Sequence, residues 1–222
     1  MSSFITVLLI LHVASGFTAL ITGGIASFTK KGGKGHRFSG RWYFWAMTGV
    51  FITALTIGIL KSLAFLFMVG FFSYYFVVRG YRQLYLKALG SSQKATLLDW
   101  FITSIALLFG VGLIGWAVYQ NINHISFWPV PFVFGSISVG FAMADSKLYI
   151  KGPTYKQHWL ASHIVSMSAG YIATWTAFIV TNVHFLPSVI VWLAPTAIGT
   201  LLILRSTRKY IKPVAKKAAV AL

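Results

Sequence analysis

The basic residues of this chain are gathered in four short segments, and their spacing is the strongest constraint on its fold. Of the 19 lysines and arginines, 18 fall in these segments. The segments are residues 29–41, 79–94 and 147–156 and the tail from Arg205. Each interval between them is about twice the ~20 apolar residues that one membrane-spanning helix needs, so each interval predicts two spans joined by a short turn. We therefore expect an all-α transmembrane bundle.

The same pattern predicts seven membrane spans and their orientation. The expected spans are residues 4–28, 42–60, 63–79, 97–119, 126–146, 158–182 and 187–204. Because cytoplasmic loops carry the excess of lysine and arginine, the N-terminus is expected outside and the C-terminus in the cytoplasm. Only Lys61 lies in a turn on the opposite side. The expected domains are a seven-helix transmembrane domain, residues 1–204, and a basic cytoplasmic tail, residues 205–222.

The composition favours a membrane protein over a nucleic-acid-binding protein. Hydrophobic residues make up 57% of the chain and charged residues 9%, against about 25% charged residues in soluble domains. The formal net charge of +17 is spread over short loops, which argues against nucleic acid and favours anionic lipid headgroups. The chain has no cysteine, which excludes disulfides and thiolate metal sites. We expect a multi-pass protein of the bacterial inner membrane, and partner subunits in that membrane stay open.

The chain has two acidic residues, and both fall within expected spans. Asp99 lies in the first turn of the fourth span, where the helix dipole favours a negative charge. Asp145 lies near the C-terminal end of the fifth span, where the dipole opposes it. An acid in a membrane is costly unless it is paired. We expect Lys147, Arg37 or a histidine to neutralise Asp145, or Asp145 to be protonated.

Two histidines share helix faces with small or hydroxylated residues. Residues advance by about 100° around a helix, so each face can be read from the sequence. The first face holds His12, Gly16, Ala19 and Gly23, and the second holds His163, Ser166, Gly170, Thr174 and Thr181. Both faces are expected inside the bundle, where simple helix–helix packing is one explanation. The expected buried polar residues are His12, Ser166, Thr174 and Thr181.

A more specific hypothesis is a haem b site, because a histidine near glycine offers an axial ligand and room for a flat macrocycle. With a rise of about 1.5 Å per residue, His12 and His163 differ by about 15 Å in depth, so one iron cannot bind both. His36 with His158 or His163, all near the cytoplasmic face, is the expected ligand pair. The residues expected to contact the cofactor, including arginines for its propionates, are His36, His158, His163, Arg37 and Arg41.

Two alternatives use overlapping residues. His36, His163 and Asp145 could hold a catalytic zinc ion with a bound water, as in a membrane hydrolase. His158 and His163 are five residues apart, about 140° around a helix, and cannot both face one metal. In a proton-coupled transporter, His12, Asp145 and the hydroxyls of the sixth span would line a polar path. A redox-associated role leads these alternatives, zinc is the less favoured cofactor, and whether the chain is an enzyme stays open.

Three stretches carry a resemblance to known proteins. They are His12-x-x-x-Gly16, His36-Arg-Phe-Ser-Gly-Arg-Trp-Tyr43, and Lys156-Gln-His-Trp-Leu-Ala-Ser-His163 continuing to Phe178. Together they resemble a family of uncharacterised multi-pass bacterial membrane proteins, a domain of unknown function, over most of the chain. The resemblance implies a helical membrane architecture and points to the same histidine-bearing segments. It implies no established activity.

Overall fold

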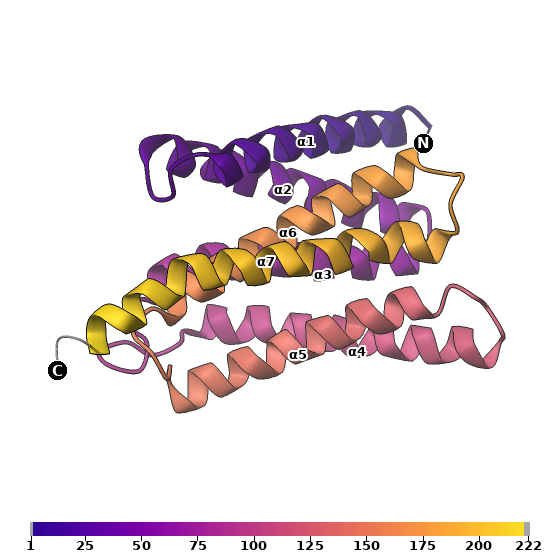
Figure 1. Ribbon diagram of the computed structural model, residues 1–222. Coiled ribbons are helices and arrows are strands. Elements are labelled where there is room, and N and C mark those ends of the chain that lie inside the picture. Colours follow the sequence, from indigo (N-terminus) through magenta and orange to yellow (C-terminus); the bar gives the residue numbers. More distant parts are fainter. Residues whose placement is uncertain (1, 220–222) are drawn as a thin grey trace.

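The computed structural model describes residues 2–219, and this part of the chain is a bundle of seven α-helices (Figure 1). The helices are α1 (Ser2–Phe28), α2 (Lys34–Leu60), α3 (Ala64–Arg82), α4 (Leu97–Ile122), α5 (Pro129–Lys151), α6 (His158–Asn182) and α7 (Ser188–Ala219). A short 3-10 helix, η1 (Gln83–Tyr85), follows α3. Residues 2–219 contain no β-strand, which confirms the all-helical prediction.

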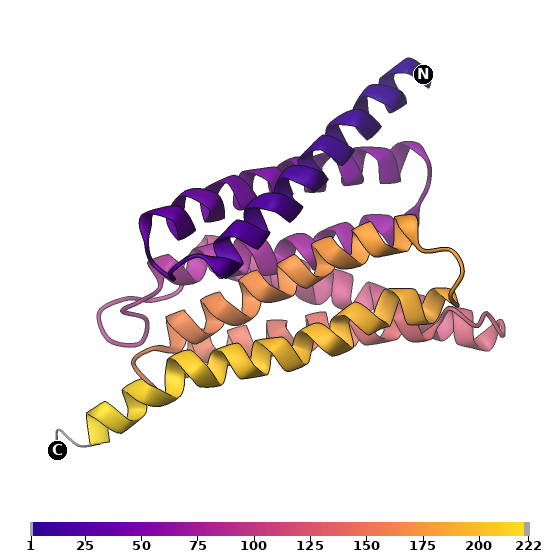
Figure 2. The same ribbon diagram turned by 45° about the horizontal axis from the view of Figure 1, so that its top comes forward.

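Successive helices run in opposite directions, so the loops alternate between two ends of the bundle (Figure 1). One end carries the α1–α2, α3–α4 and α5–α6 loops and the last turns of α7, and the start of α1 lies at the other (Figure 2). The four basic segments of the sequence fall at the first of these ends. We call it the basic end.

Six of the helices, namely α1, α2, α3, α4, α6 and α7, are long and apolar enough to cross a membrane. This number of long apolar helices is typical of a multi-pass membrane protein. The exception, α5, has a comparable length of 23 residues, but it holds no stretch of span length that is as apolar as in the other six. Two prolines, Asp145 and two lysines lower the apolar content of α5.

The helices at the basic end extend beyond the spans expected from hydropathy. α2 begins at Lys34 rather than at residue 42, so His36, Arg37 and Arg41 lie on its first turns. α7 continues without a break through the Arg205 segment to Ala219. Backbone hydrogen bonding continues a helix into polar surroundings, which a scan for apolar residues does not detect.

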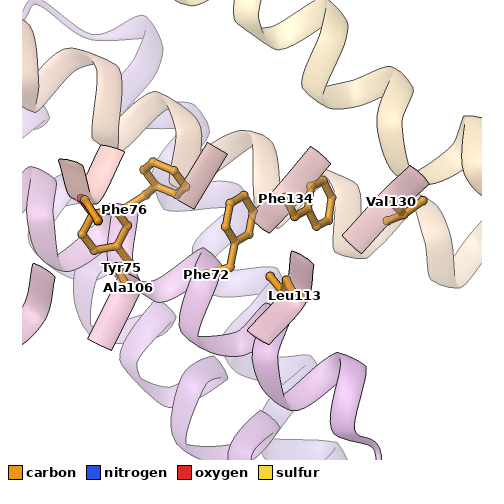
Figure 3. Packing of buried hydrophobic residues seen from close by; sticks show 8 residues of the cluster. Phe72, Tyr75, Phe76, Ala106, Leu113, Val130 and Phe134 are labelled. Atoms are coloured by element: carbon orange, nitrogen blue, oxygen red, sulfur yellow. The ribbon is translucent and has the colours of Figure 1, made fainter. Parts of the chain in front are cut away.

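α3 occupies the centre of the bundle and packs against α2, α4, α5 and α6. One apolar cluster joins it to α4 and α5 and consists of Phe72, Tyr75, Phe76, Ala106, Leu113, Val130, Phe134 and Ala142 (Figure 3). A second cluster joins α3 to α1 and α2 and consists of Ala19, Tyr43, Ala46, Met47 and Val77. Because α3 belongs to both clusters, polar side chains near its C-terminal end are enclosed by several helices.

Candidate functional site

A buried ion pair joins α3 to α5. Arg79 donates from Nη2 to Asp145 Oδ1 at 2.6 Å, and its Nε lies 2.9 Å from Oδ1 and 2.8 Å from Oδ2. Tyr75, one helical turn before Arg79, donates its hydroxyl to Asp145 Oδ2 at 2.7 Å. Asp145 is 1% exposed and Arg79 is 6% exposed. The carboxylate therefore has three donor groups and almost no contact with the surroundings of the bundle.

The same arginine reaches a third helix. Its Nη1 donates to Ser166 Oγ on α6, and its guanidinium carbon lies 5.2 Å from the centroid of the Phe141 ring. Arg79 thus links α3, α5 and α6. The expectation that Lys147, Arg37 or a histidine neutralises Asp145 was wrong, because Arg79 fills that role from inside the bundle.

A second ion pair lies where α4 begins. Arg82 donates from Nε to Asp99 Oδ1 at 2.8 Å and from Nη2 to Oδ2 at 3.0 Å. The Asp99 carboxylate also accepts from the backbone N–H of Thr96 at 2.8 Å, and the Thr96 side chain accepts from Asp99 N–H, which forms a capping box. Asp99 thus lies in the first turn of α4 and caps it, in agreement with its position in the sequence. Its ion pair with Arg82 was not predicted.

Two histidines from different helices meet near the basic end. His36 in the first turns of α2 and His163 of α6 have ring centroids 6.4 Å apart, with ring planes at 80°. Both side chains are half-buried. The sequence predicts that both residues lie near the same face of the membrane, and in the structure their rings are neighbours.

Backbone carbonyls select the neutral tautomer of both rings. His36 Nδ1 lies 2.9 Å from the carbonyl oxygen of Ala26, and His163 Nδ1 lies 2.8 Å from that of Gly80. A carbonyl oxygen only accepts, so each Nδ1 carries a hydrogen and each neutral ring keeps its lone pair on Nε2. Metal-binding histidines commonly donate their second N–H to a carbonyl in this way.

Lys31 places positive charge beside this histidine pair. The Lys31 ammonium donates to the carbonyl oxygens of Ala26 and Ser27, and partial burial lowers its pKa from the ordinary lysine value. Arg37 and Arg41 are one turn apart on α2 and are both exposed. The surroundings of the pair therefore suit a ligand that carries negative groups at its edge.

His158, the third histidine expected near this end, lies in a different environment. It is 3% exposed, and its Nε2 donates to the carbonyl oxygen of Leu86 at 3.0 Å. His158 therefore carries its hydrogen on Nε2, whereas His36 and His163 carry theirs on Nδ1. Of the two expected ligand pairs, the structure assembles His36 with His163 and places His158 apart, against the α3–α4 loop.

The expected zinc site is not assembled. Among residues 2–219, no three histidine or acidic side chains come close enough to hold a metal ion. Asp145 is held by Arg79 and Tyr75 instead of approaching His36 and His163. The set His36, His163 and Asp145 is therefore corrected to a pair of histidines without the carboxylate.

The two helix faces that carry His12 on α1 and His163 on α6 are buried to different degrees along their length. His12 is half-buried, and its Nδ1 lies 2.9 Å from the Thr53 hydroxyl of α2, where it serves helix packing. On α6, Ser166 and Thr174 are buried. Thr181 is exposed, in the last turn of α6, where neighbouring helices no longer cover the face. The expectation of a buried Thr181 was wrong for that reason.

No protein-family model, curated protein or solved structure matches this chain. The resemblance carried by the histidine-bearing stretches therefore stays a prediction.

Proposed function

We propose that the chain crosses the bacterial inner membrane seven times, with the basic end in the cytoplasm. The alternation of the loops supports this topology, since it gathers the basic segments at one end. In membrane proteins the loops that carry the excess of lysine and arginine lie in the cytoplasm. α5 is long enough to span at 23 residues, and its one acidic residue is neutralised by Arg79. If α5 did not cross, the α5–α6 loop would lie on the side opposite to the α3–α4 loop.

At the cytoplasmic end, the histidine pair is proposed to hold haem b as part of a redox-associated function. The observation that carries this proposal is the 6.4 Å separation of the His36 and His163 rings, each with its Nδ1 on a backbone carbonyl. His36 and His163 would hold the haem iron through Nε2, the nitrogen that each backbone contact leaves free.

The donor set favours haem over a bare metal ion. A structural zinc site takes four protein ligands and a catalytic one takes three, whereas two histidines meet here. Arg37 and Arg41 follow His36 on the exposed side of α2 and would pair with the propionates. Bound in this position, haem would supply one-electron chemistry, and the chain would supply ligands, orientation and charge.

Proton-coupled transport through the carboxylates has weaker support. Asp145 is bound to Arg79 and Asp99 to Arg82. A proton carrier must take up and release a proton repeatedly, so each uptake would require an arginine pair to be broken.

Absorption spectroscopy of the full-length protein tests the haem proposal. The protein is purified in an uncharged detergent from cells supplied with excess haem precursor. We expect a Soret band and an α band that sharpens on reduction. His36→Ala and His163→Ala should each abolish or strongly reduce both bands, while His12→Ala and His184→Ala, which alter histidines outside the pair, should keep them.

Two further measurements separate loss of ligand from loss of fold. Helical circular dichroism and the size-exclusion profile should be unchanged in the His36→Ala variant. His36→Met, which keeps a ligand for iron, should shift the spectrum instead of removing it. A colourless wild-type protein, or bands that persist in both alanine variants, would refute the proposal.

A further inference from the structure

A hollow of about 600 Å³ opens at the basic end between the α3–α4 and α5–α6 loops. These two loops lie at the same end of the bundle in both views (Figures 1 and 2). Its wall includes Lys87, Gly90, Lys151, Gly152, Lys156 and His158. The volume is within the range of about 300–1,000 Å³ that is usual for small-ligand sites. The hollow shares no lining residue with the histidine pair.

The two loops are closely fitted where they meet. Gly90 and Gly152 have φ values of +81° and +75°, which glycine adopts without strain. A Cβ atom added at Gly90 would lie 2.6 Å from Cδ of Pro153. His158 ties the loops together through its hydrogen bond to the Leu86 carbonyl. The hollow thus has a defined frame made from both loops.

Three lysines line the hollow, and no acidic side chain is available to neutralise them. The chain has two acidic residues, and both are bound to arginines elsewhere, Asp145 to Arg79 and Asp99 to Arg82. The Lys87 ammonium lies 4.8 Å from the centroid of the Trp159 ring. Like charges gathered in one hollow attract an anion from outside the chain.

A buried polar atom in the wall also lacks a partner. His158 is 3% exposed, and its Nδ1 has no hydrogen-bond partner within the described part of the chain. Most buried polar atoms are hydrogen-bonded, so an unpaired one calls for a ligand, a water or an ion. Because its Nε2–H is donated to the Leu86 carbonyl, the neutral ring presents Nδ1 as an acceptor, which a hydroxyl of a bound phosphate or headgroup can satisfy.

We propose that this hollow binds a phosphate-bearing anion, with Lys87, Lys151 and Lys156 as its charged contacts. Phosphate oxygens accept several hydrogen bonds at once, which suits the donors of three lysines in one wall. At the end of a membrane bundle, such a group comes from an anionic phospholipid headgroup or from free phosphate. The proposal is independent of haem binding.

Titration of the full-length protein in an uncharged detergent tests this site. The probes are dioctanoyl phosphatidylglycerol, inorganic phosphate and, as a zwitterionic control, dioctanoyl phosphatidylcholine, with the thermal unfolding midpoint as the readout. The test variant is Lys151→Gln/Lys156→Gln. The matched control is Lys30→Gln/Lys34→Gln, which removes the same charge from exposed residues of the same end, outside the hollow.

We expect saturable stabilisation of the wild type by an anionic probe. The test variant should weaken apparent binding about tenfold or more, while the control stays within about twofold, since each lysine near an anionic group contributes of order 1 kcal/mol. Saturation by phosphatidylglycerol but not by inorganic phosphate assigns the site to a lipid headgroup, and saturation by inorganic phosphate assigns it to the phosphate group itself. Equal weakening in both double variants, or no saturable binding of any probe, would overturn the proposal.

Discussion

Arg79 holds Asp145 through Nε and Nη2 at 2.6–2.9 Å, and this pair joins the central helix α3 to α5 inside the bundle. Both side chains are almost fully buried. A charge taken out of water is costly, and the cost is recovered only while its partner stays in place. The pair therefore makes the contact between the two helices depend on both residues together.

Removal of one partner should be far more harmful than removal of both. We expect Arg79→Met to lower the free energy of unfolding by about 3–5 kcal/mol, because it leaves the Asp145 carboxylate buried and unpaired. Adding Asp145→Leu in the same chain should recover at least about half of that loss, because apolar side chains then replace both charges. Denaturant unfolding of the protein in detergent measures both effects.

Arg82→Met provides the matched control for this prediction. Its side chain is 22% exposed, and Asp99 keeps its hydrogen bonds to Thr96 when the arginine is lost. The loss of stability should be clearly smaller than for Arg79→Met. The loss of stability in the double variant Arg79→Met/Asp145→Leu is compared with the sum of the losses in Arg79→Met and Asp145→Leu measured separately. If the two are equal, the ion pair does not couple α3 to α5.

The all-helical fold could be predicted from the sequence because hydropathy and charge act along the chain. Long apolar stretches between basic segments can satisfy their backbone hydrogen bonds in a membrane only as helices. The ends of α2 and α7 were missed, since helix geometry continues past the apolar stretch into residues such as Lys34 and Arg205. α5 is not among the six helices that are long and apolar enough to cross a membrane, so the seventh span stays a prediction.

The candidate site was predictable only where helix geometry limits the choices. His158 and His163 are five residues apart, so only one of them can face His36. Which one does so depends on the rotation of α6 against α2, and that is set by tertiary packing. Arg79 was counted with the loop charges, although its spacing of four from Tyr75 puts both on the face that meets Asp145.

Glycine contacts between α4 and α5 lead to a second prediction. A Cβ atom at Gly135 would lie 2.6 Å from the carbonyl oxygen of Gly110 and 2.9 Å from the backbone nitrogen of Ile114. Neither backbone atom can move without shifting α4. Gly135→Ala should therefore destabilise the protein by about 1–3 kcal/mol through overpacking.

Gly140 on the same helix is the control, because a Cβ atom there would meet nothing within 4 Å. Gly140→Ala should be neutral or stabilise by up to about 1 kcal/mol, since alanine favours the helix more than glycine does. Thermal unfolding of both variants in detergent measures the difference. Equal midpoints for the two variants would contradict the close approach of α4 and α5.

The absence of cysteine makes the proposed topology testable by labelling single introduced thiols. Suitable exposed positions are Ser91→Cys and Thr154→Cys at the basic end, and Asn123→Cys and His184→Cys at the other. In intact spheroplasts, a membrane-impermeant maleimide should label the Asn123 and His184 variants. The Ser91 and Thr154 variants should react only after the membrane is permeabilised, because a seven-span chain places both loops in the cytoplasm.

The pair Asn123 and Thr154 decides the number of spans, because these two positions flank α5. If α5 crosses the membrane, one variant reacts from outside and the other does not. If α5 stays on one side, both variants react from the same side, and the six apolar helices alone span the bilayer. In that case Thr154 and Ser91 would differ in labelling, and the hollow formed by their two loops could not exist in the membrane-embedded protein.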